Sequence, residues 1–169
     1  MPDFTVKNEF ATDQTTFWEK CFFDEEYNRR LYAETLKFPG WKLLELKTEG
    51  NKIIRKVHID PPVTGMPGPV KKALGDKFSY VEEGTYDKTT HRYTFKVTPS
   101  TMAEKAKTVG ELWTESVGDK KIIRHAKVHV EVKVFMIGGM VEDKLLGDLK
   151  HSYEQAAEFT QKFLAEKGL

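Results

Sequence analysis

The chain has 169 residues, 39% of them hydrophobic, which suits a single domain (residues 1–169) with a substantial core. Its 27 Lys and Arg residues nearly balance its 26 Asp and Glu residues, and the formal charge is +1. No basic cluster is interleaved with aromatic residues. The composition therefore argues against a nucleic-acid partner and against more than transient contact with an anionic membrane.

The single cysteine and the short apolar runs argue against a disulfide-bonded protein and against a membrane-spanning one. Cys21 has no second cysteine to pair with, and its setting in FWEKCFF indicates a buried, inert thiol. The opening MPDFTVKNEF lacks a charged-then-apolar signal segment, and the longest apolar runs fall short of the ~20 residues of a membrane span. We therefore expect a cytoplasmic protein.

The N-terminal forty residues predict one strand followed by two helices. Residues 3–10 alternate apolar and polar side chains, which is the period of a half-buried strand. Thr12 or Asp13 can cap a first helix, and Asp24 with the acidic residues after it begins a second. Phe38-Pro39-Gly40 ends that helix.

The central part of the chain predicts antiparallel strands. Residues 41–47 and 52–59 flank Glu49-Gly50-Asn51, which is typical of a hairpin turn. Residues 60–69 hold four prolines and two glycines and predict an irregular loop, with one helical turn at 70–74. Further strands are expected at 78–86, 91–99 and 104–116, and a hairpin at 117–120 leads into the last strand.

The last quarter of the chain changes from a strand period to a helical one. From Ile122, small apolar residues alternate with charged residues and histidines up to Val134. Beyond residues 135–137 the apolar residues recur three, four or seven positions apart, which predicts one helix of roughly 25–30 residues, about 40–45 Å long. A helix this long needs an equally long apolar surface, which a curved antiparallel sheet supplies.

This order of elements resembles the START-like superfamily (SRPBCC, Bet v 1-like) of helix-grip proteins, which includes the birch-pollen-allergen fold. In detail it is similar to uncharacterised bacterial START-like proteins and to sterol-binding VASt domains. The resemblance implies an α+β fold in which a sheet of about seven strands curves around the C-terminal helix and leaves a cavity for a hydrophobic ligand. The segments that carry the resemblance are EFATDQTTFWEKCFFDEEYNRRLYAET, WKLLELKTEGNKIIRKVHIDPP, PGPVKKALGDKFSYVEEGTYD and FMIGGMVEDKLLGDLKHSYEQAAEFTQKFL.

Two features besides the resemblance favour a cavity over a filled core. Gly138, Gly139 and Gly147 are expected to leave room beneath the N-terminal half of the long helix, and residues 106–114 present a face of small side chains. The expected cavity wall consists of Tyr80, Glu82, Tyr93, Phe95, Thr108, Leu112, Val128, Val130, Val141, Leu145 and Leu149. The expected entrance and lid consist of Val63, Met66, Phe135, Met136, Ile137 and Met140.

The leading functional hypothesis is binding, and by extension transfer, of a hydrophobic small molecule such as a sterol, another lipid or an aromatic polyketide. No cofactor or metal is expected: His125 and His129 lie about 13 Å apart along one strand, too far to share a metal ion. A monomer or weak dimer is expected.

Two alternative functions remain open. One is a cyclase/aromatase- or hydrolase-type enzyme in the same cavity, with Glu82 and Tyr80 or Tyr93 as its acid–base set. This requires Glu82 to point inward; the competing interpretation places it outside, or at a bulge near Gly84. The other is a client-binding module with a filled core.

Overall fold

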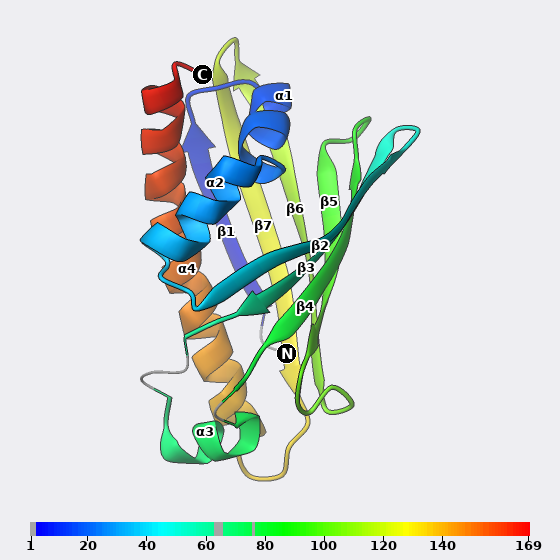
Figure 1. Ribbon diagram of the computed structural model, residues 1–169, viewed down its shortest axis with the longest axis vertical. Helices are drawn as coiled ribbons and strands as arrows, with labels where there is room; N and C mark the ends of the chain where they lie inside the picture. The colour runs from blue at the N-terminus through cyan, green and yellow to red at the C-terminus, as the bar shows by residue number, and fades with distance from the viewer. Residues whose placement is uncertain (1–2, 63–65, 76) are drawn as a thin grey trace.

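The computed structural model describes residues 3–62, 66–75 and 77–169. Within these ranges it forms one seven-stranded antiparallel sheet, in the order β1-β7-β6-β5-β4-β3-β2. The sheet curves around the long helix α4 (Gly138–Lys167), with α1 and α2 near one end and α3 (Gly68–Leu74) at the other (Figure 1). This confirms the predicted fold class. The strands are β1 (Asp3–Phe10), β2 (Gly40–Glu49), β3 (Lys52–Asp60), β4 (Tyr80–Asp87), β5 (Arg92–Pro99), β6 (Ala106–Gly118) and β7 (Lys121–Val132).

Alternation along the strands decides which side chains face α4. On β7 every second residue from Ile122 to Val132 is buried, and the residues between them lie on the outer face. The outer face carries His125, which stacks on Trp113, and His129, whose Nδ1 lies 2.6 Å from Asp3 Oδ1. Register shifts occur between Leu43 and Glu45 and between Ser116 and Gly118, but β4 pairs regularly with both neighbours.

The two N-terminal helices begin at capped residues and widen into π-helical turns. Asp13 caps α1 (Gln14–Phe17), and Asp24 caps α2 (Glu25–Arg29), through hydrogen bonds from the backbone N–H three residues on. The π-helical turns are η1 (Trp18–Phe22) and η2 (Arg30–Thr35). Cys21 on η1 is buried, as the sequence predicts, and burial raises the pKa of its thiol to about 12.

The long helix α4 has 30 residues and ends at Gly168, whose φ of 69° is the left-handed conformation that favours glycine. Its C-terminal half packs bulky side chains such as Phe159 and Phe163 against the chain, whereas its N-terminal half buries few large residues. Among the helices of the described ranges, none is both long enough and apolar enough to cross a membrane.

The buried apolar side chains form two clusters, one toward each end of the molecule. The first joins α1, η1 and α2 to the C-terminal half of α4, and includes Trp18 and Phe163. The second joins α3 to the C-terminal part of β7 and the N-terminal half of α4, and includes Leu74 and Val141. Phe95 packs against both clusters, which places it at the boundary between them.

Candidate functional site

A cavity of about 230 Å³ lies between the sheet and α4, lined by residues of both apolar clusters. A single water needs only about 10–15 Å³, so this space is much larger than a packing defect. The filled core required by the client-binding alternative is therefore not present. Side chains from β3 to β7 form the floor, α4 forms one wall, and residues of η1, α2, η2 and α3 close the ends.

Most of the wall predicted from the sequence lies around this cavity. The strands contribute Tyr80, Glu82, Phe95, Thr108, Leu112, Val128 and Val130, and α4 contributes Val141, Leu145 and Leu149. Glu82 points inward, and the regular pairing of β4 removes the alternative of a bulge at Gly84. Of the predicted lid, Met66 lines the cavity, and Val63 lies outside the described residues.

The remaining predicted residues lie away from the cavity, and the sequence interpretation needs correction there. Tyr93 is fully buried on the inner face but belongs to the first apolar cluster and does not line the cavity, and its ring packs across Gly84. Phe135 and Met136 at the turn into α4 are 90% and 86% exposed, and Met140 also faces solvent. Ile137 packs against the second apolar cluster but does not line the cavity.

Close approach at two sheet glycines keeps the cavity open. A Cβ atom on Gly84 would lie 2.1 Å from Cζ of Tyr93, and one on Gly110 would lie 2.5 Å from Cζ of Phe95. The rings of Tyr93 and Phe95 on β5 therefore lie against the neighbouring strands and do not project toward α4. Their centres are 5.7 Å apart, and the two rings stack.

The helix glycines do not have the role that the sequence suggested. A Cβ atom on Gly139 or Gly147 would meet nothing within 4 Å, because both positions face outward, and Gly138 is packed against the carbonyl oxygen of Val132. The room beneath α4 therefore comes from the sheet.

One polar group in the cavity is an ion pair between two strands. Arg55 on β3 donates from Nη2 to Oε2 of Glu82 on β4 at 3.1 Å, and the Tyr93 hydroxyl donates to the same oxygen at 2.9 Å. The Arg55 guanidinium also lies 4.3 Å from the centre of the Phe22 ring and donates to the Phe22 carbonyl oxygen. Burial would lower the pKa of Arg55, but Tyr93 and Glu82 more than offset this and the pKa lies above its usual value.

A second buried arginine lines the cavity without an acidic partner. Arg124 on β7 is 5% exposed, and its Nη2 donates to Oδ1 of Asn8 at 2.7 Å. Its Nε has no acceptor among the described residues, and the rings of Phe10 and Tyr153 cover the guanidinium at 5.2 Å. Burial lowers the pKa of Arg124 from its ordinary value, whereas the paired Arg55 shifts the other way.

Three tyrosines place further polar groups at the cavity. Tyr32, Tyr80 and Tyr153 line it, and within the described residues none of their hydroxyls has a hydrogen-bond partner. Burial raises the pKa of Tyr153 to about 12 and the pKa of Tyr80 well above its ordinary value, so both phenols are neutral near pH 7. These hydroxyls are free to bond with a ligand.

The sequence interpretation missed both arginines, although a signal was present. Arg55 alternates in phase with Val57 and Ile59, and Arg124 alternates in phase with Ile122 and Ala126. A charged residue in the apolar phase of a strand predicts a buried charge, which in proteins is paired or functional.

The curved sheet, the long helix laid across it and the cavity between them make up the helix-grip fold of START-like and Bet v 1-like proteins. Solved structures with this fold include an aromatase/cyclase from Streptomyces sp. R1128, with a TM-score of 0.63 and 8% identity over 99% of this chain and 96% of that one. A START superfamily protein from Mycobacterium smegmatis has a TM-score of 0.60 and 16% identity, covering 96% and 98% of the two chains. Norcoclaurine synthase from Thalictrum flavum, solved with dopamine and hydroxybenzaldehyde, has a TM-score of 0.60 and 12% identity, covering 98% and 87%.

Within that class, the chain belongs to the family described as protein of unknown function (DUF2505), whose model matches residues 5–164. Among curated proteins, none is similar to the chain in sequence. The solved structures share less than a fifth of their residues with this chain, so they establish the fold and leave the function to the geometry of the cavity.

Proposed function

We propose that this protein binds a hydrophobic small molecule, a sterol or another lipid, in the cavity between the sheet and α4. The observation that carries the proposal is a cavity of about 230 Å³ whose walls are largely aliphatic and aromatic. Burying an apolar ligand there contributes about 25 cal/mol per Å² of surface removed from water, less the cost of ordering the ligand. Binding of this kind needs no chemistry from the protein.

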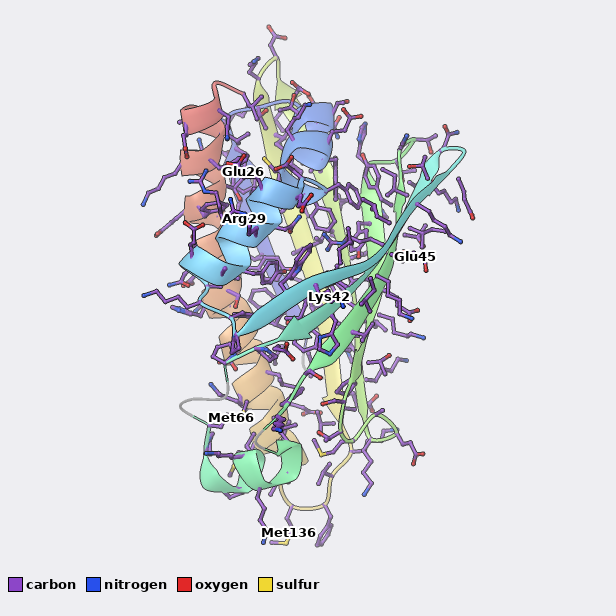
Figure 2. The ribbon with its side chains drawn as sticks, in the orientation of Figure 1. Glu26, Arg29, Lys42, Glu45, Met66 and Met136 are labelled. Carbon is purple, nitrogen blue, oxygen red and sulfur yellow. The ribbon has the colours of Figure 1, made fainter. Side chains whose placement is uncertain are left out.

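The segment between β3 and α3 is the proposed entrance. Pro61, Pro62 and Met66 from this segment line the cavity, and the cavity reaches Leu74 at the end of α3. Figure 2 shows Met66 beside α3, at the end of the molecule where α4 begins. Pro61 and Pro62 have no backbone N–H to donate, so opening the chain at these two positions breaks no hydrogen bond from their nitrogens, which suits an entrance.

Native mass spectrometry of gently purified protein tests the proposal directly. We expect a co-purified species at one copy per chain, which extraction with organic solvent removes. Delipidated protein should then gain several degrees in melting temperature with a matching sterol or fatty acid, since a ligand that binds only the native state stabilises it. Protein that purifies without a bound species, and whose melting temperature is unchanged across a broad lipid panel, would rule out this function.

A second candidate is an enzyme of the cyclase/aromatase or hydrolase type acting on a hydrophobic substrate in the same cavity. The observation that favours it is the inward carboxylate of Glu82, with the Tyr93 hydroxyl on its Oε2 and Tyr80 on the same strand. Glu82→Gln should abolish turnover of such a substrate while ligand binding persists.

Because Glu82→Gln also removes the countercharge of Arg55, its turnover is compared per molecule of folded protein. Tyr93→Phe keeps the ion pair and removes only the hydroxyl, which makes it the matched variant. Unchanged turnover in both variants would remove Glu82 and Tyr93 from any catalytic role.

A further inference from the structure

Two cations and two anions line the cavity, but they do not all pair with one another. They are Arg55, Glu82, Arg124 and Asp148. Arg55 and Glu82 neutralise each other through their ion pair. Asp148 pairs with Lys144 one turn earlier on α4, and its side chain is half exposed, so its charge is screened by water. The charge that remains inside is the cation of Arg124.

A lone buried cation is costly unless something compensates it. Taking an ion out of water costs several kcal/mol even after relaxation, and proteins normally place a carboxylate beside a buried arginine. Asn8, the one side chain that accepts from Arg124, is neutral. The structure leaves this charge without a counterion among the residues it describes.

The arrangement around Arg124 fits an anion that enters from the cavity. A guanidinium presents five N–H donors in a planar fork, and here one Nη is used by Asn8 while Nε has no acceptor. Phe10 and Tyr153 cover the guanidinium with their rings, which excludes bulk water. A carboxylate suits this site because its two oxygens match the fork. The Tyr153 hydroxyl, which has no partner in the described chain, is a second donor nearby.

The rest of the cavity lining indicates that the remainder of the ligand is apolar. Val128 and Val130 continue from Arg124 along the inner face of β7, and Val141, Leu145 and Leu149 face them from α4. These aliphatic walls accept a chain or ring system and offer it no charge.

We propose that the ligand is a hydrophobic carboxylic acid, held with its carboxylate against Arg124 and its apolar body between β7 and α4. This deepens the proposed function and rests on it. The proposal predicts that acids are preferred over neutral sterols and alcohols, which would contact the same apolar walls but leave the cation of Arg124 without a counterion.

The test compares two probes with the same tail, decanoic acid and 1-decanol, on delipidated full-length protein at pH 7.5. Dissociation constants are measured by calorimetric titration for the natural chain and for Arg124→Met, which keeps the unbranched apolar stem of the side chain and removes the charged guanidinium. We expect the natural protein to bind the acid at least about tenfold more tightly than the alcohol, the effect of one charge-assisted hydrogen bond. In Arg124→Met this preference should disappear while binding of the alcohol is retained.

Two outcomes overturn the inference while the proposed function stands. Equal affinity of the natural protein for acid and alcohol would show that no anion site operates, and this comparison needs no variant to fold. A preference for the acid that survives in Arg124→Met would assign the anion to another residue. Failure of both probes to bind, together with an unchanged melting temperature across the lipid panel, overturns the proposed function as well.

Arg55→Met/Glu82→Met is the control for the removal of a buried guanidinium that lines the cavity. It removes the ion pair as a unit, so the net charge of the cavity and the cation of Arg124 are unchanged. Its preference for the acid should persist, because neither partner of the ion pair is assigned to the carboxylate. A loss in this double variant equal to that in Arg124→Met would contradict a specific role of Arg124.

Discussion

At the scale of single residues, the cavity depends on the absence of a side chain at two positions of the sheet. Gly84 and Gly110 leave space that the rings of Tyr93 and Phe95 occupy, so these large side chains fill the layer next to the sheet and not the centre. A side chain at either glycine would lift an aromatic ring into the cavity. The shape of the site is thus set by two residues that do not line the cavity themselves.

Gly110→Ala should destabilise the protein and reduce its capacity for ligand. The new methyl group would lie 2.5 Å from Cζ of Phe95 and 2.9 Å from the backbone oxygen of Lys127, and the backbone oxygen has little freedom to move. Overpacking of this kind costs about 1–3 kcal/mol, measurable by urea denaturation. Gly147→Ala on the exposed side of α4 is the control and should stabilise by about 0.5–1 kcal/mol. A Gly110→Ala variant as stable as the natural chain would show that Phe95 is free to shift.

The ion pair of Arg55 and Glu82 should show strong energetic coupling. Arg55→Met leaves a mostly buried carboxylate without its cation, which costs about 3–5 kcal/mol of unfolding free energy. The double variant Arg55→Met/Glu82→Met removes both charges and should be more stable than Arg55→Met alone. A double-mutant cycle from urea denaturation measures the coupling, and additive losses would contradict it.

At the scale of elements, Thr114 on β6 bonds the first helix and the π-helical turn after it to the sheet. Thr114 on β6 accepts from Trp18 Nε1 at its Oγ1 and from Gln14 Nε2 at its carbonyl oxygen, at 3.0 Å in each case. Both donors belong to the α1–η1 segment, which lies about 100 residues before Thr114 in sequence. These hydrogen bonds hold the segment against the sheet and place Phe17 and Phe22 at the end of the cavity.

Thr114→Val should cost about 1–3 kcal/mol, because the buried indole N–H of Trp18 then has no acceptor. Thr108→Val is the matched control: Thr108 is on the same face of β6 but its hydroxyl bonds to no described residue, so its loss should change stability by well under 1 kcal/mol. The measurement is thermal unfolding followed by tryptophan fluorescence. Equal shifts in the two variants would mean that the Trp18 hydrogen bond is not special.

The elements themselves were largely predictable, because their periods are local properties of the chain. The alternation from Ile122 and the helical spacing after residue 137 predict β7 and α4 closely, and Asp24 marks the start of α2. The π-helical turns η1 and η2 were not predicted, since a wide turn depends on packing against the sheet and leaves no spacing of its own.

The cavity was less predictable than the elements, because it depends on contacts between residues distant in sequence. Alternation assigns Tyr93 to the inner face correctly, but only the position of Gly84 on the next strand decides that its ring lies flat. In the same way Arg124 sits in an apolar phase, but its lack of an acidic partner emerges only when Asn8 pairs with it across β1 and β7.

At the scale of the whole molecule, the proposed entrance and the most exposed apolar residues lie at the same end. Met66 beside α3 and Met136 at the turn into α4 both lie at the end of the molecule opposite the C-terminus (Figure 2). Phe135 and Met136 expose almost their entire side chains, and the exposed Lys133, which pairs with Glu131, lies two residues before Phe135. Apolar side chains next to a cation at the tip of a protein suit brief insertion into a lipid surface.

Phe135→Ser/Met136→Ser should therefore slow ligand uptake from membranes without weakening binding in solution. Burying a phenylalanine in lipid contributes about 1.5–3 kcal/mol, so the rate of transfer of a fluorescent fatty acid from anionic vesicles should fall by about tenfold or more. The unfolding free energy should change by less than about 0.5 kcal/mol, because both side chains are almost fully exposed. Leu43→Ser/Leu44→Ser removes another exposed apolar pair, on the edge strand β2, and should leave the rate unchanged. If both double variants take up ligand as fast as the natural chain, the tip between β7 and α4 is not the point of contact with the membrane.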